Sequence, residues 1–315
     1  MPAFNDDNLV TYWSRVRTLV DTCLSNMGIH PMNAYGGTLY LRAKHGWVPP
    51  VTPEELDYTY GIIGGYSQSV WYSYYDGGYY LPYETVIPTE MFNQDSNVRW
   101  VSAPLAQAVE ASAFDRCQSL RWVSLPMCVT IGSVAFQNCY SMATIDLPLC
   151  ESIGSYAFNN CNIAGISLPA CISVGNYAFN QCDEISAADL PVCTTIGNSA
   201  FNGCDKIATV DAPNCTVIGS NAFAYCSKLS SVNVPVCASI GNWTFSQCFK
   251  LARLDLTSVP TVPMTYMRTF WSTPIEGYTT YTSGRYGSVY VPASLYSQFL
   301  SASYWSDIVS RIVSV

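Results

Sequence analysis

The sequence predicts a repeat solenoid of the α/β type, with short parallel strands on its concave face and a small α+β domain in front of it. Three observations indicate this fold. A phenylalanine recurs every 21 or 22 residues, a proline keeps the same period, and an Ile-Gly or Val-Gly pair lies between them. A unit of this length cannot enclose a core by itself, so it buries its apolar side against the next unit. The phenylalanines are Phe114, Phe136, Phe158, Phe179, Phe201, Phe223 and Phe245.

Each unit is predicted to contain one short strand. In the unit that reads ATIDLP, Ile145 and Leu147 alternate with Asp146, so the two apolar side chains point inward and the carboxylate points outward. Pro148 ends the strand because proline cannot donate a ladder hydrogen bond. The glycine of the next Ile-Gly pair, Gly154, is expected to permit a turn where a Cβ would be costly. The Ala-Phe pair then packs inward, and stacked strands run parallel about 4.8 Å apart.

The cysteines follow the same period. One column lies two residues after the proline and one lies three residues after the phenylalanine, and together they hold thirteen of the fourteen cysteines. A disulfide framework, a set of metal sites and a cysteine-lined core are the three alternatives. A column of seven cannot pair completely, and zinc sites need four converging ligands, for which the chain offers only two histidines. We therefore expect both columns to be core positions, where free cysteine packs as a small hydrophobe.

The repeat LPxCxxIGxxAFxxCxxL resembles the Treponema-type leucine-rich repeat of BspA-like bacterial surface proteins. The resemblance covers about residues 98–256, and the tail GSVYVPASLYSQFLSASYWSDIVSRI (287–312) resembles the closing segment of these proteins. It implies an arc-shaped, right-handed solenoid whose usual role is binding. We therefore divide the chain into an N-terminal domain (1–97), a leucine-rich repeat solenoid (98–256) and a C-terminal capping segment (257–315).

Residues 1–97 resemble no known family. Apolar residues from Leu9 to Met27, Cys23 among them, form one stripe of a predicted helix. The tyrosine-rich stretch that follows contains Asp76-Gly77-Gly78, which predicts a hairpin turn between aromatic strands. We expect this domain to cap the open first turn of the solenoid, a role that is compatible with attachment to a larger assembly.

The outward strand positions are the candidate ligand-binding site. The first two strands present Arg-Trp twice, which is the composition of a binding hot spot, and flat indoles suit sugar rings or apolar side chains. Two positions later in each strand lies a column with four aspartates, which suits a cation or a basic ligand. The alternatives are that the tryptophans cover the junction with the N-terminal domain and that the aspartates keep a solvated face soluble. The predicted residues are Arg99, Trp100, Arg121, Trp122, Asp146, Asp189, Asp211 and Asp255.

Composition excludes several classes of function. Charged residues make up only 11% of the chain, the net charge is −8, and no basic run exists, so we expect no binding to nucleic acid. No stretch reaches eighteen apolar residues, so we expect no membrane insertion. The usual nucleophile, phosphate-loop, dinucleotide and metalloprotease motifs are missing, so we expect no enzyme, no cofactor and no metal.

The remaining prediction is a binding protein. Low charge, many tyrosines and the lack of a recognisable signal peptide favour an exposed phage virion protein, of the tail or capsid, that binds a protein or glycan on the host cell surface. Residues 1–97 would then dock on other virion proteins. The alternatives are an extracellular adhesin on a bacterial cell surface, and a structural scaffold in which the solenoid forms a homo-oligomer.

Overall fold

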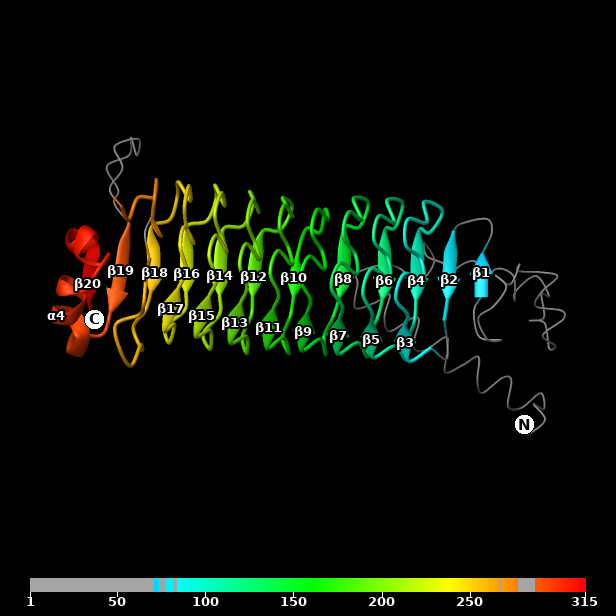
Figure 1. Ribbon diagram of the computed structural model, residues 1–315, viewed down its shortest axis with the longest axis horizontal. Helices are drawn as coiled ribbons and strands as arrows, with labels where there is room; N and C mark the ends of the chain where they lie inside the picture. The colour runs from blue at the N-terminus through cyan, green and yellow to red at the C-terminus, as the bar shows by residue number, and fades with distance from the viewer. Residues whose placement is uncertain (1–70, 74–76, 82–83, 267, 277–286) are drawn as a thin grey trace, which may run out of the picture. The chain divides into compact units, whose positions relative to one another are not determined.

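The computed structural model describes residues 71–73, 77–81, 84–266, 268–276 and 287–315 (Figure 1). The chain divides into two compact units, Met1–Pro82 and Tyr83–Val315. In the first unit the strands β1 (Trp71–Ser73) and β2 (Gly78–Tyr80) pair antiparallel, which confirms the predicted aromatic hairpin. The helix predicted between Leu9 and Met27 lies outside the described residues.

The second unit is a stack of coil turns held by two parallel ladders of strands (Figure 1). We call the first the front ladder. Its strands are β4 (Trp100–Ser102), β6 (Trp122–Ser124), β8 (Thr144–Asp146), β10 (Ile166–Ser167), β12 (Ala187–Asp189), β14 (Thr209–Asp211), β16 (Ser231–Asn233), β18 (Arg253–Asp255), β19 (Ser288–Val291) and β20 (Ile312–Ser314). The first eight strands, β4 to β18, are the predicted ones, and the structure adds β19 and β20 from the capping segment.

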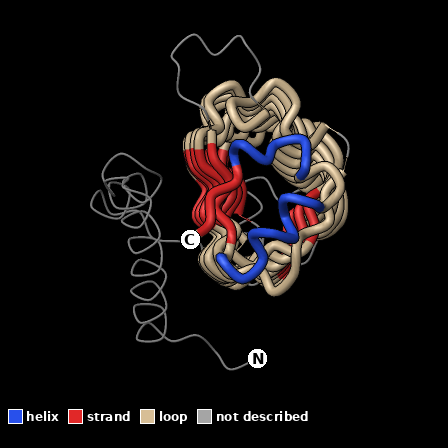
Figure 2. Tube along the Cα trace, turned by 90° about the vertical axis from the view of Figure 1, so that its left-hand side faces the viewer, coloured by secondary structure: helices blue, strands red, loops and turns tan. Residues whose placement is uncertain are grey.

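The second ladder, which we call the rear ladder, was not predicted. It consists of eight two-residue strands, one per turn, at the residue pair that ends in the repeated Ile or Val. They are β3 (Val86–Ile87), β5 (Ala108–Val109), β7 (Thr130–Ile131), β9 (Ser152–Ile153), β11 (Ser173–Val174), β13 (Thr195–Ile196), β15 (Val217–Ile218) and β17 (Ser239–Ile240). Seen along the stack, the two ladders lie on different sides of one coil (Figure 2).

The phenylalanines form one continuous stack through the core. Neighbouring rings lie 4.8–5.9 Å apart between centroids and within 14° of parallel. The stack extends beyond the predicted repeats at both ends, because Phe92 stacks on Phe114 and Phe270 stacks on Phe245. The turn around Phe92 is difficult to recognise as a repeat in the sequence, because Pro88 and Asp95 stand where later turns have other residues. Its phenylalanine nevertheless keeps the 22-residue spacing.

The repeated glycine is required for close stacking between turns, and not for a special turn conformation. A Cβ would be costly at Gly154, as expected, because it would lie 2.6 Å from backbone atoms of Gly132 and Ser133 in the preceding turn. Only Gly77 and Gly203 have a positive φ among the described glycines, so a turn conformation is not the cause. A Cβ on Gly219 would lie 2.5 Å from the backbone nitrogen of Asn198 and 2.6 Å from the carbonyl carbon of Gly197. The turns are therefore packed backbone against backbone along the glycine column.

Positive φ angles occur at other residues instead. Two positions in each turn, on either side of the Ala-Phe pair, adopt φ near +60°, for example Tyr177 and Gln181. This region is uncommon for side chains other than glycine. Here it aims backbone N–H groups at the next turn: Tyr177, Phe179 and Gln181 donate to carbonyl oxygens one turn ahead at 2.7–2.8 Å. These bonds offset the conformational cost and hold the side of the coil that has no strands.

One turn is a residue shorter than the rest, and it interrupts the front ladder. The phenylalanines Phe158 and Phe179 are 21 residues apart, and the missing residue falls between Cys161 and Ile163. As a result β8 and β10 are joined only by an isolated bridge from Thr144 to Gly165. The rear ladder runs through this turn without a break.

The last turn is closed by short helices: η2 (Ala293–Leu295), α4 (Tyr296–Ser301) and η3 (Ser306–Arg311). They lie across the end of the coil (Figure 2). Trp305 anchors them, since its Nε1 donates to the carbonyl oxygen of Pro263 at 3.0 Å and its ring packs against Phe270 and Phe299. This is the capping arrangement that a solenoid end requires.

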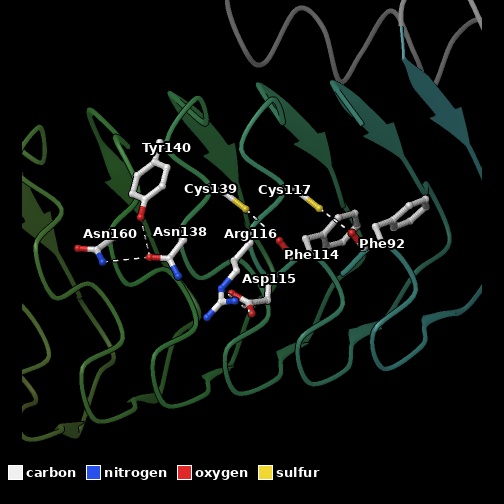
Figure 3. A network of polar contacts seen from close by, with 9 residues as sticks. All are labelled: Phe92, Phe114, Asp115, Arg116, Cys117, Asn138, Cys139, Tyr140 and Asn160. Carbon is white, nitrogen blue, oxygen red and sulfur yellow. Dashed lines mark hydrogen bonds and ion pairs between the residues drawn. The ribbon is translucent and has the colours of Figure 1, made fainter. Parts of the chain in front are cut away.

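All thirteen described cysteines are buried and free, which confirms the prediction of a cysteine-lined core. They also have a polar role that the sequence did not show. In the column after phenylalanine, each thiol donates to the carbonyl oxygen of a phenylalanine in the preceding turn, as Cys117 does to Phe92 at 2.8 Å and Cys139 to Phe114 at 3.1 Å (Figure 3). In the other column, each thiol donates two residues ahead, as Cys171 does to Ser173 at 3.3 Å. Cysteine therefore fills a small apolar site and satisfies a carbonyl group at the same time.

We expect Gly219→Ala to destabilise the solenoid by about 1–3 kcal/mol, because the new methyl group would overlap backbone atoms of the preceding turn. The matched control is Gly165→Ala, whose added methyl group meets no atom within 4 Å. Urea unfolding of both variants measures the difference. Equal stabilities would contradict the packing role of the glycine column.

The buried thiols predict a loss of stability at high pH. Burial raises the pKa of Cys150 and Cys237 to about 11 and that of Cys182 to about 12, from an ordinary value of 9.0. Between pH 9.0 and these values the unfolded thiols lose protons that the folded ones keep. The stabilisation is therefore complete below pH 9.0 and falls as the pH rises, by about 1.4 kcal/mol per pH unit for each thiol.

Urea unfolding at about pH 8 and about pH 10 measures this loss. In Cys182→Ala the free energy of unfolding should fall less between these two pH values, because one buried thiol no longer contributes to the loss. An unchanged dependence in this variant would show that other groups cause the loss.

Candidate functional site

The outward side chains of the front ladder form one continuous face, as predicted. In each three-residue strand the middle side chain is buried, for example Ile145 and Val210. The first and third side chains point outward and align with their counterparts in adjacent turns, so Thr209 lies opposite Ser231 and Asp189 lies opposite Asp211. We call this the front face. It holds six of the eight predicted site residues, and the other two, Arg99 and Arg121, immediately precede its first two strands. The structure divides the eight into separate groups.

The tryptophan–arginine group lies at the β4–β6 end of the front face. Trp100 and Trp122 are paired in register, and their rings stack with centroids 5.3 Å apart and 8° between planes. Trp100 is only 6% exposed, so its indole is closed to a ligand, whereas Trp122 is half-buried. Of the two predicted tryptophans, only Trp122 is partly exposed to solvent.

The two arginines of this group are exposed and close together. Arg99 and Arg121 immediately precede β4 and β6, and the backbone N–H of Arg121 donates to the carbonyl oxygen of Arg99 at 2.7 Å. Neither guanidinium group forms a salt bridge with any residue that the structure describes. Two adjacent, unneutralised positive charges in a chain of net charge −8 are an attractive site for an anionic group.

The middle of the front face is lined by small side chains. Thr144, Gly165, Ala187 and Thr209 occupy the position that Trp122 holds in its turn, and all four are exposed. A Cβ built on Gly165 would meet no atom within 4 Å. The backbone is therefore accessible along this part of the face.

The four predicted aspartates do not act as one group. Asp146 is half-buried, and Asp189 and Asp211 are exposed on adjacent turns. Asp211 accepts a hydrogen bond from Nδ2 of Asn233 at 2.6 Å. In the residues that the structure describes, no group of three or more His, Cys, Asp or Glu side chains is placed to hold a metal ion.

Asp255 belongs to a cluster at the β18 end that is closed in the sense that its charges pair with one another, although the side chain of Arg253 is 47% exposed. Nη2 of Arg253 lies 2.8 Å from Oδ2 of Asp255, and the same guanidinium group lies 4.0 Å above the ring of Tyr290. Partial burial raises the pKa of Asp255, but the hydrogen bonds from Arg253 and Thr257 outweigh it and leave the pKa below the ordinary value of 3.8. Its charge is thus used within the protein. Sequence analysis missed Arg253 and Tyr290, although the alternation in SVYV places Tyr290 outward.

A second polar network lies on the side of the coil that carries the positive φ angles. Asn138 accepts hydrogen bonds from Nδ2 of Asn160 and from the hydroxyl group of Tyr140, and Nε of Arg116 lies 3.8 Å from Oδ2 of Asp115 (Figure 3). Burial raises the pKa of Asp115 above its ordinary value, against the opposing effect of Arg116. The hydrogen bond between Asn160 and Asn138 connects adjacent turns, so this network stabilises the stacking of the turns.

Comparison with models of protein families shows which family the chain belongs to. The model described as the BspA type leucine rich repeat region, in six copies, matches residues 85–152 and 151–273, more than half of the chain. The chain belongs to the BspA-type leucine-rich repeat family. The match begins before the predicted boundary at Val98 and continues past Leu256, in agreement with the phenylalanine stack.

Solved structures with similar folds include other leucine-rich repeat proteins of bacteria. The leucine-rich repeat protein of Treponema pallidum is 25% identical, covers 58% of this chain and 87% of its own, and has a TM-score of 0.46. A leucine-rich repeat protein from Bacteroides ovatus is 15% identical, with 81% and 100% covered and a TM-score of 0.41. A leucine-rich cell surface protein from Faecalibacterium prausnitzii is 15% identical, with 81% and 94% covered and a TM-score of 0.30. No curated protein matches this BspA-type chain. At these TM-scores no inference rests on the solved structures.

BspA-type repeats generally serve binding between proteins, and no catalytic group is assembled by the described residues of the front face. Within the described part of the chain, no helix has the length and hydropathy of a membrane span. The front face thus has an end with exposed arginines and a half-buried tryptophan, a middle of small side chains, and an end where Asp255 is paired with Arg253.

We expect Arg253→Ala to raise the pKa of Asp255, because the variant removes the guanidinium group that binds its carboxylate. The stabilisation from this carboxylate is present above pH 3.8 and is lost as the pH falls through the lowered folded-state value. NMR titration of the Asp255 carboxyl group measures the change, and Arg121→Ala is the control. An unchanged titration in Arg253→Ala would contradict the closed cluster.

Proposed function

We propose that this protein is a non-enzymatic adhesion protein that binds an anionic ligand on a cell surface through the β4–β6 end of the front face. The observation that carries the proposal is the pair of exposed arginines, Arg99 and Arg121, which directly precede Trp100 and Trp122, are joined by a backbone hydrogen bond, and form no salt bridge with any described residue. Arginine binds carboxylate and sulfate groups through two parallel hydrogen bonds, and an adjacent indole adds apolar contact with a ring or side chain. Such a pairing suits an acidic glycan or an acidic protein segment.

The small side chains beyond Trp122 support the same function. Because Thr144 and Gly165 are exposed and add little bulk, a ligand bound to the arginines can continue along the front face towards Asp189. The exposed aspartates there repel further anionic groups, which limits the negative charge of the ligand to one end. The ligand would therefore be anionic at one end and neutral or basic beyond it.

Two settings fit an adhesion protein of this kind. Membership of the BspA-type family favours an adhesin on a bacterial surface. The low charge and the 23 tyrosines favour a phage virion protein that binds its host, with the Met1–Pro82 unit attached to the particle. Neighbouring tail or capsid genes would favour the virion, and their absence would favour the adhesin.

We expect the double variant Arg99→Ala/Arg121→Ala to weaken binding at least about tenfold, and Trp122→Ala to weaken it several-fold, with thermal stability retained. Attachment to cells and binding to arrays of acidic and neutral glycans measure the loss. The effect should shrink at high salt, because exposed charges are screened.

The control is Arg116→Ala, which removes an exposed guanidinium group from another side of the coil. Unchanged binding by the double variant would refute the proposed site. Loss of binding to the same extent in Arg116→Ala would refute it as well, because the cause would then be net charge and not the position of the arginines.

A further inference from the structure

An apolar, nearly uncharged band runs along the solenoid between the two ladders. It begins after each strand-ending proline and ends with the first residue of the rear-ladder strand. In six successive turns this stretch carries a large apolar side chain that is 41–48% exposed. These side chains are Leu105, Met127, Leu149, Ile172, Val192 and Val217. Surface residues of this kind are ordinary when scattered, but one in the same four-residue stretch of each of six successive turns indicates an interaction site.

The band has almost no charge. Six turns of four residues after the proline contain twenty-four residues, and Glu151 is the only charged one. The charges of this part of the solenoid lie elsewhere, on the front face at Asp189 and Asp211 and in the turn where Lys206 binds Glu184 at 2.6 Å. A charged partner would therefore find no complement on the band.

Three polar side chains within the band donate hydrogen bonds to the protein itself. The hydroxyl group of Thr194 donates to the carbonyl oxygen of Ile172, and that of Thr216 donates to the carbonyl oxygen of Thr194, both at 3.2 Å. Nδ2 of Asn214 donates to the carbonyl oxygen of Pro191 at 2.6 Å. Covering these groups with an apolar surface breaks none of these bonds, so the usual desolvation cost of a polar group is small here.

We propose that the band is the interface of a homodimer, with the band of a second copy as its occupant. A chain of net charge −8 repels its own copy, so a symmetric contact is favoured on the face from which charge is missing. A twofold contact pairs the same patch with itself, and an uncharged, apolar, flat strip is complementary to itself.

The size of the band fits a weak dimer. The row of exposed apolar side chains continues to Val86 at one end and to Met264 at the other, which are 36% and 61% exposed. Both residues occupy the position in their turn that is equivalent to Val217 in the rear ladder. Nine turns at about 4.8 Å give a length of roughly 40 Å, and four residues give a width of roughly 13 Å. Two copies would bury about 1,000 Å² in total, which is at the lower limit for a specific interface. The dimer should therefore dissociate on dilution.

Sedimentation velocity of the full chain from about 5 μM to about 500 μM tests the proposal. We expect the wild-type protein to shift from monomer to dimer across this range, and Met127→Glu and Val192→Glu each to raise the dissociation constant at least about tenfold, because each places a charge in an apolar contact. The matched control is Phe249→Glu, since Phe249 and Met127 are both 45% exposed and the change in net charge is the same. Its dimer should be unchanged within about twofold.

A cross-link provides a second measurement. The native thiols of the solenoid are buried, so a cysteine introduced at Ile172, near the middle of the band, in a Cys23→Ser background should be the reactive one. We expect it to form a disulfide-linked dimer on mild oxidation, while a cysteine at Phe249 in the same background stays monomeric. A wild-type protein that is monomeric at every concentration would overturn the proposal. So would a dimer that Met127→Glu, Val192→Glu and Phe249→Glu affect equally.

Discussion

The close approach of successive turns is the constraint on which the rest of the structure depends. Parallel strands set the distance between turns at about 4.8 Å, and the coil must keep that distance all the way round. On the two ladders the strand hydrogen bonds enforce it. On the remaining side, the phenylalanine stack and the backbone bonds from residues with positive φ do so, with Tyr177 and Gln181 as examples. Where the backbones pack most tightly, only glycine fits, as at Gly219.

Much of this fold could be predicted from the sequence, because a structural constraint that recurs in every turn selects the same residue type at the same position of each repeat. The strands at Thr144–Asp146 and its equivalents, the inward phenylalanines and the buried cysteines all follow from period and polarity. The rear ladder was missed because its strands are two residues long, too short to show alternation. The cost of a Cβ at the repeated glycine was predicted, but its cause, the backbone of the neighbouring turn, is visible only in the structure.

The candidate site was harder to predict, for a physical reason. Register placed Arg99, Arg121 and Trp122 together, and register is encoded in the repeat. The state of each side chain depends on neighbours that do not repeat. Trp100 and Trp122 look equivalent in sequence, yet only the second is accessible. Asp189 and Asp255 also look equivalent, yet the carboxylate of Asp255 is bound by Arg253, which occurs once in that column.

The thiol columns have a consequence for where such a chain can exist. A core stapled by disulfides must be oxidised to fold, and a core built around metal must be supplied with ions. The described core of this protein needs neither, because its thirteen cysteines act as neutral donors to carbonyl groups. Among the described residues, therefore, no disulfide and no metal centre has to form before the solenoid can fold, and a reducing agent would find no disulfide to break.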